Sequence, residues 1–409
     1  MKHAKRLIGP FKQVVTMNNL PLKGALRNDQ LEIIEDGGIL INNGKIEKVD
    51  TYNSLKKGEG IEISKLEGDF VALPGFIDCH THICYGGSRY LDFEDRNSGV
   101  SYIDIAKRGG GIWSTVKHTR AAEKMDLIEG MILRLDRHLK NGITTVEVKS
   151  GYGLSVSQEV KMLKAIRSAN EHHVVDLIPT CLAAHIVPKE FSNECEYLNH
   201  ILKELVPMVK EQKLCSRFDI FIEESAFSAK ASRAYLKALN RQGFDITVHG
   251  DQFTPIGSTI AIECGAVSVD HLEASTDKEI LAIADSNVVA AALPGASIGL
   301  GCSFAPARKL LDAGASLAIA SDWNPGSAPQ GNLLSQASIL ATFEKLSAAE
   351  VLSGITYRAA KALALEYRGR LSIDYIADIV AFPCNDFREI LYSQGELYPS
   401  HVWKNGDLI

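Results

Sequence analysis

Residues 70–93 read FVALPGFIDCHTHICYGGSRYLDF. An apolar run of strand length ends at Asp78, and His80 and His82 follow it one residue apart. Alternate residues of a β-strand point to the same face, so the two imidazoles are predicted to face one point while Thr81 faces away. Two convergent imidazoles can begin a zinc-type site. Such a pair by itself is structural more often than functional, so a metal site requires further ligand candidates elsewhere in the chain.

Seven further segments begin with a mostly apolar run of strand length, and all of them except 287–295 end in polar residues. They lie at 143–150, 175–185, 218–224, 244–251, 267–273, 287–295 and 317–326. Stretches with apolar residues at three- and four-residue spacing separate them, as at 121–140 and 154–173. Eight strand–helix units predict an α/β fold, a parallel (β/α)8 TIM barrel over residues 69–365. No strand is followed by a GxGxxG or GxxxxGK[ST] turn, so nucleotide binding has no support.

The two ends of the chain have a different pattern. GGILINNGKIEKV (37–49) places Asn43-Gly44 between alternating segments, which is a hairpin signal. ADIVAFP (377–383) and HVWKNGDLI (401–409) have the same character. We therefore predict a second, small β-sandwich domain formed by both termini, residues 1–68 and 366–409, with the barrel inserted between them.

Composition limits the kinds of partner. The 409 residues are 45% hydrophobic and 23% charged, with a formal net charge of −6, as in ordinary soluble proteins. An acidic chain without a basic patch predicts no nucleic acid and no membrane partner. No apolar run is long enough to span a bilayer, and the basic start lacks the apolar core of a secretion signal. Eight scattered cysteines without a CxxC pair favour reduced thiols and a cytoplasmic location.

Polar residues close nearly every predicted barrel strand, where the active sites of such barrels lie. They are His80, His82, Lys149, His185, Glu223, His249, Asp251, His271, Asp322 and Asn324. His249 and Asp322 are the obvious partners for the first two histidines, because a catalytic metal needs three or four ligands and an open position. We expect the other histidines on the surface, namely His3, His118, His138, His172, His173, His200 and His401.

Several motifs resemble the amidohydrolase superfamily, whose members are metal-dependent hydrolases on a (β/α)8 barrel. They are PGFIDCHTHI (74–83), TVHGD (247–251), VDHLE (269–273) and ASDWNPGS (320–327). Longer stretches, HTHICYGGSRYLDF (80–93), TTVEVKSGYGL (144–154) and SDWNPGSAPQGN (321–332), resemble the imidazolonepropionase family within it. This resemblance implies a hydrolase that opens 4-imidazolone-5-propanoate to N-formimidoyl-L-glutamate in histidine degradation.

The resemblance also implies a site. It assigns one transition-metal ion per subunit, zinc or iron, to His80, His82, His249 and Asp322. Lys149 lies on the second strand, too early to be the carboxylated lysine that bridges two metals in other members. A small-molecule substrate with a carboxylate and a homodimer are implied as well. The substrate-binding residues are expected to be Arg89, Tyr152, His185, Gln252, Asn324, Gly326 and Ser327.

The catalytic residues are expected to be His271, Asp322 and His185. A metal ion would activate water for attack on the ring carbonyl. Asp322 would take the water's proton and pass it to the leaving nitrogen, while His271 would polarise the carbonyl oxygen. Gln252 stands where some relatives carry an acid. A glutamine can orient a ring or a water but cannot accept a proton, so the general base is left between Asp322 and His271.

Two alternatives stay open. A deaminase or chlorohydrolase of the same superfamily would use the same metal ligands on a heteroaromatic ring, but Arg89 suits a carboxylate better than a neutral ring. Without the resemblance, Arg89 would be read as a solvated loop residue. A non-catalytic binding protein on an inactive barrel is the other alternative, and the metal content of the protein distinguishes it from an enzyme.

Overall fold

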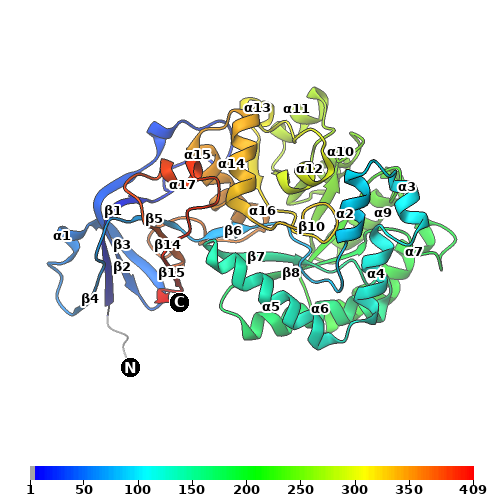
Figure 1. The fold of residues 1–409 in the computed structure, drawn as a ribbon, viewed down its shortest axis with the longest axis horizontal. Helices are drawn as coiled ribbons and strands as arrows, with labels where there is room; N and C mark the ends of the chain where they lie inside the picture. The colour runs from blue at the N-terminus through cyan, green and yellow to red at the C-terminus, as the bar shows by residue number, and fades with distance from the viewer. Residues whose placement is uncertain (1–4) are drawn as a thin grey trace.

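Eight parallel strands follow one another around a barrel in the computed structural model, which describes residues 5–409 (Figure 1). Each strand pairs in parallel with the next along the chain. The predicted (β/α)8 barrel is therefore confirmed. The strands are β6 (Phe76–Asp78), β7 (Ile143–Lys149), β8 (Asp176–Ala184), β9 (Arg217–Ile220), β10 (Asp245–Gly250), β11 (Ser268–His271), β12 (Val289–Ala292) and β13 (Ser316–Ile319).

The barrel closes between its last and first strands through residues just beyond both. The Asp322 N–H donates to the His80 carbonyl at 3.1 Å, and the His82 N–H donates to the Trp323 carbonyl at 2.9 Å. Thr81 and Trp323 form a parallel bridge at the same place. This seam brings the His-x-His pair of the first strand beside Asp322, which is far away in sequence.

Helices surround the barrel. Those between β6 and β7 are α2 (Tyr90–Asn97), α3 (Tyr102–Lys107), α4 (Ile112–Ala121) and α5 (Lys124–Lys140). The others are α6 (Val156–His172), α7 (Glu194–His200), the π-helical turn η2 (Ile201–Leu205), α8 (Val206–Glu211), α9 (Ala229–Asn240), α10 (Gly257–Cys264), α11 (Asp277–Asp285), α12 (Pro294–Leu300), α13 (Ala307–Asp312), α14 (Leu333–Glu344), α15 (Ala348–Gly354), α16 (Tyr357–Ala362) and α17 (Arg388–Tyr392). Within residues 5–409, no helix has the length and apolar character that a membrane crossing requires.

The surface prediction for the remaining histidines is wrong for His138, which is completely buried. His138 lies on the stripe of α5 that also carries Met131 and Leu135, at the three- and four-residue spacing of a core-facing surface. Its ring packs edge-on against Trp323, with 4.8 Å between the ring centroids. His118 and His172 are exposed as predicted. His173, His200 and His401 are half-buried, and His3 lies outside the described residues.

Both ends of the chain contribute to a second, small sheet, on the left of Figure 1. N-terminal β5 pairs with β1 and also with C-terminal β14, which joins the two ends. Asn43 and Gly44 have φ of 50° and 75°, as a tight hairpin turn requires. The elements are β1 (Lys5–Val15), η1 (Asn28–Gln30), β2 (Ile33–Asn42), β3 (Lys45–Thr51), α1 (Tyr52–Leu55), β4 (Ile61–Lys65), β5 (Val71–Pro74), β14 (Ile379–Phe382), β15 (His401–Lys404) and β16 (Asp407–Leu408).

This small sheet encloses its own apolar core. Its strands are hydrogen-bonded into one sheet, and β1 carries an irregularity between Ile8 and Phe11. Ile8, Phe11, Ile39, Ile379 and Trp403 are buried together although all of them belong to this sheet. One curved sheet thus packs against itself in the manner of a sandwich.

Candidate metal centre and substrate pocket

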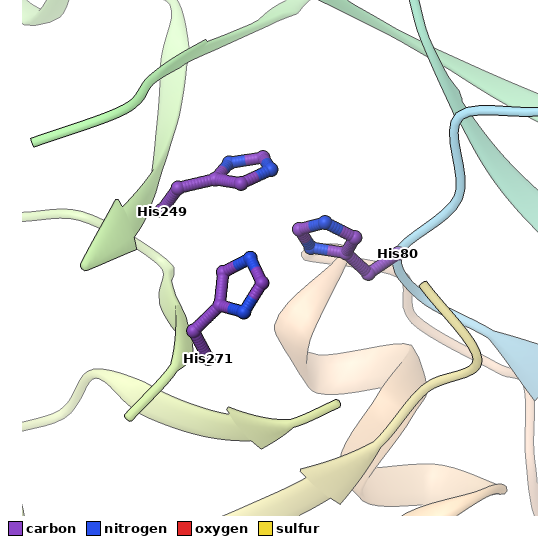
Figure 2. Close-up of side chains that lie close together, drawn as sticks. All are labelled: His80, His249 and His271. Carbon is purple, nitrogen blue, oxygen red and sulfur yellow. The ribbon is translucent and has the colours of Figure 1, made fainter. Parts of the chain in front are cut away.

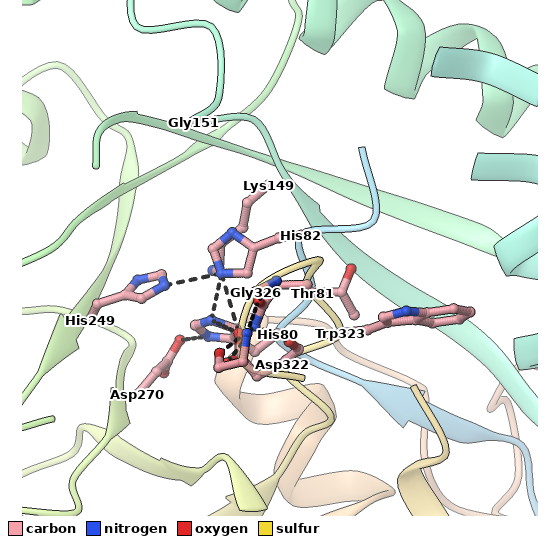
Figure 3. A network of polar contacts seen from close by, with 12 residues as sticks. His80, Thr81, His82, Lys149, Gly151, His249, Asp270, Asp322, Trp323 and Gly326 are labelled. Atoms are coloured by element: carbon pink, nitrogen blue, oxygen red, sulfur yellow. Dashed lines mark hydrogen bonds and ion pairs between the residues drawn. The ribbon is translucent and has the colours of Figure 1, made fainter. Parts of the chain in front are cut away.

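Five polar side chains converge at the carboxyl ends of the barrel strands (Figures 2 and 3). His80 and His82 follow β6, His249 lies near the end of β10, His271 ends β11 and Asp322 follows β13. All five are buried. Figure 2 shows the rings of His80, His249 and His271 around one shared space.

The distances between these side chains match a metal site. His82 Nε2 lies 3.3 Å from His80 Nε2 and 3.2 Å from His249 Nε2. Asp322 Oδ1 lies 3.5 Å from His80 Nε2 and 3.4 Å from His82 Nε2. Tetrahedral ligands at about 2.0–2.1 Å from one ion are about 3.4 Å apart. The structure therefore brings His80, His82 and Asp322 together with suitable spacing, while His249, the fourth predicted ligand, approaches through His82 and groups with His80 and His271.

Carboxylates behind the ligands orient two of the imidazoles. His80 Nδ1 lies 2.6 Å from Asp270 Oδ2, and His249 Nδ1 lies 2.8 Å from Asp219 Oδ2. Such partners fix the ring orientation and keep Nε2 for a metal. Neither aspartate was predicted from the sequence. The available signal was an acid directly after an apolar residue inside each of two short strands, Phe218-Asp219-Ile220 in β9 and Val269-Asp270 in β11.

The protonation state of the histidines also fits a metal ion. Burial lowers the pKa values of His80 and His82 well below the ordinary value for histidine, and it lowers the pKa of His249 to about 3. All three rings are therefore neutral. His80 Nδ1 is hydrogen-bonded to Asp270 and His249 Nδ1 lies 2.8 Å from Asp219 Oδ2, which leaves their Nε2 lone pairs for the space that the rings share. Lone pairs that face one another repel unless a cation lies between them. The donor set of imidazole nitrogens and a carboxylate oxygen fits a divalent transition metal.

Lys149 lies beside His82 (Figure 3), but its ammonium group is bound by two carboxylates. Its Nζ lies 2.8 Å from Glu147 Oε1 and 2.9 Å from Asp219 Oδ2. Burial alone would lower the pKa of Lys149, but the two carboxylates raise it above its usual range. The charged lysine thus balances Asp219, the partner of His249. A lysine that stays protonated is not available for carboxylation.

A pocket opens over the candidate metal ligands. It is lined by all seven residues predicted to bind substrate and by His82, His249, His271 and Asp322. Arg96, Ile112, Phe221, Phe253 and Leu300, which the sequence analysis did not single out, complete its wall. Sequence positions spread from 82 to 327 therefore form one cavity, and their individual roles are proposals.

Three residues in the pocket are suited to proton transfer or polarisation. The ring of His185 stacks on that of His82, and burial lowers the pKa of His185 to about 3. Burial acts in the same direction on His271, but Glu273, 3.5 Å away, raises its pKa above the ordinary value. Burial raises the pKa of Asp322. His271 and Asp322 also have φ of 89° and 51°, a strained backbone of the kind found at functional sites.

Buried carboxylates hold the two loops that carry Tyr152 and Gln252. Glu159 accepts hydrogen bonds from the N–H groups of Gly151, Gly153 and Leu154 at 3.0, 2.8 and 2.7 Å, around Tyr152. Glu223 accepts from the N–H groups of Phe253 and Thr254 at 2.8 and 3.1 Å, next to Gln252. The strand-end carboxylate of Glu223 is therefore turned toward backbone rather than toward the metal ligands.

Asn324 organises the loop after β13. Its Oδ1 accepts from the N–H groups of Gly326 and Ser327 at 2.7 and 2.8 Å. Its Nδ2 donates to Asp322 Oδ2 and to Ser327 Oγ, both at 2.9 Å. The amide is thus committed to its own loop and to the metal-ligand candidate Asp322.

Comparisons with known proteins agree with this geometry. The model of the Amidohydrolase family matches residues 71–409. An imidazolonepropionase from Bacillus cytotoxicus is 37% identical over 408 residues, which cover 98% of this chain and 96% of the relative. One from Bacillus cereus is also 37% identical, over 97% of this chain and 94% of the relative.

Solved structures share the fold at lower identity. A mutant of an atrazine chlorohydrolase from Arthrobacter aurescens, complexed with zinc and atraton, has a TM-score of 0.70 at 18% identity and covers 98% of this chain and 94% of its own. An adenosine deaminase from Xanthomonas campestris with bound zinc has a TM-score of 0.69 at 17% identity and covers 98% and 92%. At this identity the likeness concerns the fold.

Proposed function

The chain belongs to the amidohydrolase family and, within it, to the imidazolonepropionases, and on this premise we propose that it hydrolyses 4-imidazolone-5-propanoate to N-formimidoyl-L-glutamate in histidine degradation. Water adds across a ring C–N bond, so a C–O bond forms as the bond between the carbonyl carbon and the ring nitrogen breaks. The observation that carries the proposal is the convergence of His80, His82 and Asp322, with His249 Nε2 3.2 Å from His82 Nε2, beneath a pocket that contains Arg89.

We propose that these four ligands hold one transition-metal ion per subunit, zinc or iron. Imidazole and carboxylate ligands suit either metal. A bound ion would supply Lewis-acid chemistry, which activates water at neutral pH and polarises a carbonyl. The support in this chain is the spacing of the ligand atoms, their neutral imidazoles and the carboxylates behind them.

The chain's own residues would move the protons. Asp322 would accept the proton of the attacking water and pass it to the departing ring nitrogen. His271 would donate a hydrogen bond to the carbonyl oxygen, because Glu273 favours its protonated form. His185 Nδ1 lies 3.1 Å from the Gly151 carbonyl, which leaves Nε2 for the substrate.

The remaining pocket residues would bind and orient the substrate. Arg89 would bind the propionate carboxylate, while Tyr152 and Gln252 would contact the ring. Gly326 and Ser327 would form the wall that Asn324 holds in place. A deaminase or chlorohydrolase could use the same ligands, but a neutral ring leaves Arg89 without a role.

The experiment that tests this function follows the loss of imidazolone absorbance. Purified protein is supplied with zinc or with iron, and its metal content is measured beside its turnover. We expect about one ion per chain and turnover that a chelator abolishes. Metal-loaded protein that leaves the imidazolone intact would refute the proposed function.

A homodimer, a cytoplasmic location and the absence of nucleic acid or membrane partners belong to the same proposal. The free thiols of all eight cysteines support a reducing compartment. The net charge of −6 supports the absence of polyanionic partners. Sedimentation velocity tests the oligomeric state, and a mass of one chain would contradict the homodimer.

A further inference from the structure

Two arginines of the α2 segment face the same wall of the pocket. Arg89 precedes the first residue of α2, and Arg96 lies seven residues later, two helical turns along the same side. Both line the pocket, and both contact Gly326. Arg96 Nη2 donates to the Gly326 carbonyl at 3.1 Å, and Arg89 Nη1 lies 2.3 Å from the position that a Cβ at Gly326 would take. The end of the Arg89 side chain thus lies directly against the Gly326 backbone.

The carboxylates around these arginines balance only one of the two charges. Asp92 Oδ2 accepts from Arg89 Nε at 2.7 Å and from the Gly111 N–H at 2.8 Å. No carboxylate of residues 5–409 lies within ion-pairing distance of Arg96. Burial, and after it the charge of Arg89, lowers the pKa of Arg96. Two guanidinium groups and one carboxylate leave an excess of one positive charge at the pocket wall.

The hydrogen-bonding groups of both arginines are only partly used. A guanidinium carries five N–H donors in one plane. Asp92 engages Arg89 through Nε, which leaves the Nη1 and Nη2 end of the fork for another acceptor. Gly326 engages Arg96 through Nη2, which leaves Nη1 and Nε. A carboxylate offers two oxygens with about four lone-pair directions and matches both the free donors and the excess charge.

We propose that Arg96 is a second binding residue for the carboxylate of the substrate, and that Arg89 and Arg96 form a two-arginine site in which Asp92 positions Arg89. The inference rests on the proposed function for the identity of the substrate. It also narrows the substrate class to heterocycles with a short acidic side chain, because a neutral analogue would leave two positive charges at the wall with only Asp92 to balance them.

The test compares an acid with its amide in the zinc-loaded protein. Imidazole-4-propanoate and imidazole-4-propanamide differ only in the charge of the side chain, and calorimetry gives the affinity for each. We expect the wild-type chain to bind the acid at least about tenfold more tightly, the effect of one charged hydrogen bond. Arg96→Gln should remove most of this preference, raise KM for imidazolonepropanoate about tenfold or more and change kcat little.

Two further variants separate charge from the bond to Gly326. Arg96→Lys keeps the charge and should retain part of the acid preference, whereas Arg96→Gln keeps a donor for Gly326 without the charge. Arg108→Ala removes an exposed arginine that pairs with Asp95 at 3.7 Å outside the pocket, and it should leave both affinities unchanged.

The outcomes distinguish this inference from the proposed function. If Arg96→Gln weakens the acid and the amide equally, or binds both like wild type, Arg96 only ties α2 to Gly326 and the inference is wrong. The same holds if the wild-type chain does not prefer the acid. If the wild-type chain prefers the acid through Arg96 but leaves imidazolonepropanoate intact, the two-arginine site stands and the proposed function fails.

Discussion

The candidate metal ligands and the loops around the pocket, here called the rim (the loops that carry Arg89, Tyr152, Gln252 and Asn324), are built in different ways. The candidate ligands lie on barrel strands or within a few residues of their ends, and the pairing of those strands sets their spacing. The rim residues lie on loops, and one polar side chain fixes each loop: Asp92, Glu159, Glu223 and Asn324. On the proposed function, the barrel register would set the chemistry, whereas local hydrogen bonds would set which substrate fits. Changes at the centre should abolish activity, and changes at the rim should alter substrate binding.

The strongest test of this contrast removes a ligand. His249→Ala should lower the metal content and reduce turnover by more than about 100-fold, beyond the effect expected for losing a partner behind a ligand. His172→Ala, at an exposed histidine, is the matched control and should behave like wild type. Metal analysis and the imidazolone assay check both variants. A His249→Ala protein with full metal and normal turnover would remove His249 from the site.

The next effect concerns the carboxylate behind His249. Asp219→Asn should weaken metal affinity by about 10- to 100-fold, because the amide orients the His249 ring less well and leaves Lys149 with one carboxylate partner. Competition with a chelator measures the affinity. Glu263→Gln, at an exposed acid paired with Arg233, is the control. Equal affinities in Asp219→Asn and wild type would show that the barrel alone orients His249.

A smaller effect is expected at the rim. Glu159→Gln replaces a carboxylate that accepts three backbone hydrogen bonds with an amide whose NH2 group cannot accept them. Loss of one charged hydrogen bond is worth about 1.5–3 kcal/mol, so KM should rise about tenfold as the Tyr152 loop loosens. Metal content should be unchanged. A variant that loses metal instead would place Glu159 with the centre rather than with the rim.

The same contrast explains what the sequence could predict. The His-x-His spacing and the polar strand ends depend on period-two geometry, so the barrel and the four ligand candidates follow from short local patterns. The prediction that Arg89 binds substrate depended on a family resemblance, because an arginine in a loop belongs to no periodic sequence pattern. Arg96 was missed, since its contact with Gly326 joins residues 230 positions apart. Asp219 and Asp270 were missed because their partners lie on other strands.

His138 shows that burial alone does not make a metal ligand. Like His249, it is buried and has its pKa lowered to about 3, first by burial and then by Arg137. Among the described residues 5–409, no second imidazole is found in contact with it, and its Nε2 lies 3.8 Å from Asp78 Oδ2. Replacing it by leucine should therefore leave metal content and turnover unchanged. What separates His138 from the ligand candidates is that no convergent donors of the part of the chain described by the structure surround it.

Its contribution should appear only in the pH dependence of stability. An unfolded histidine binds a proton below about pH 6.5, whereas folded His138 stays neutral down to about pH 3. The unfolded state therefore binds more protons in this window, and stability falls by about 1.4 kcal/mol per pH unit as the pH decreases. Burial raises the pKa of Asp78 to about 7, so Asp78 makes the folded state more stable as the pH decreases, in wild type and in His138→Leu alike. Urea unfolding gives the free energy of unfolding at pH 7 and at pH 5.5. The decrease between the two pH values should be smaller by about 1 kcal/mol in His138→Leu than in wild type. An equal decrease in both proteins would mean that His138 gains a proton in the folded state.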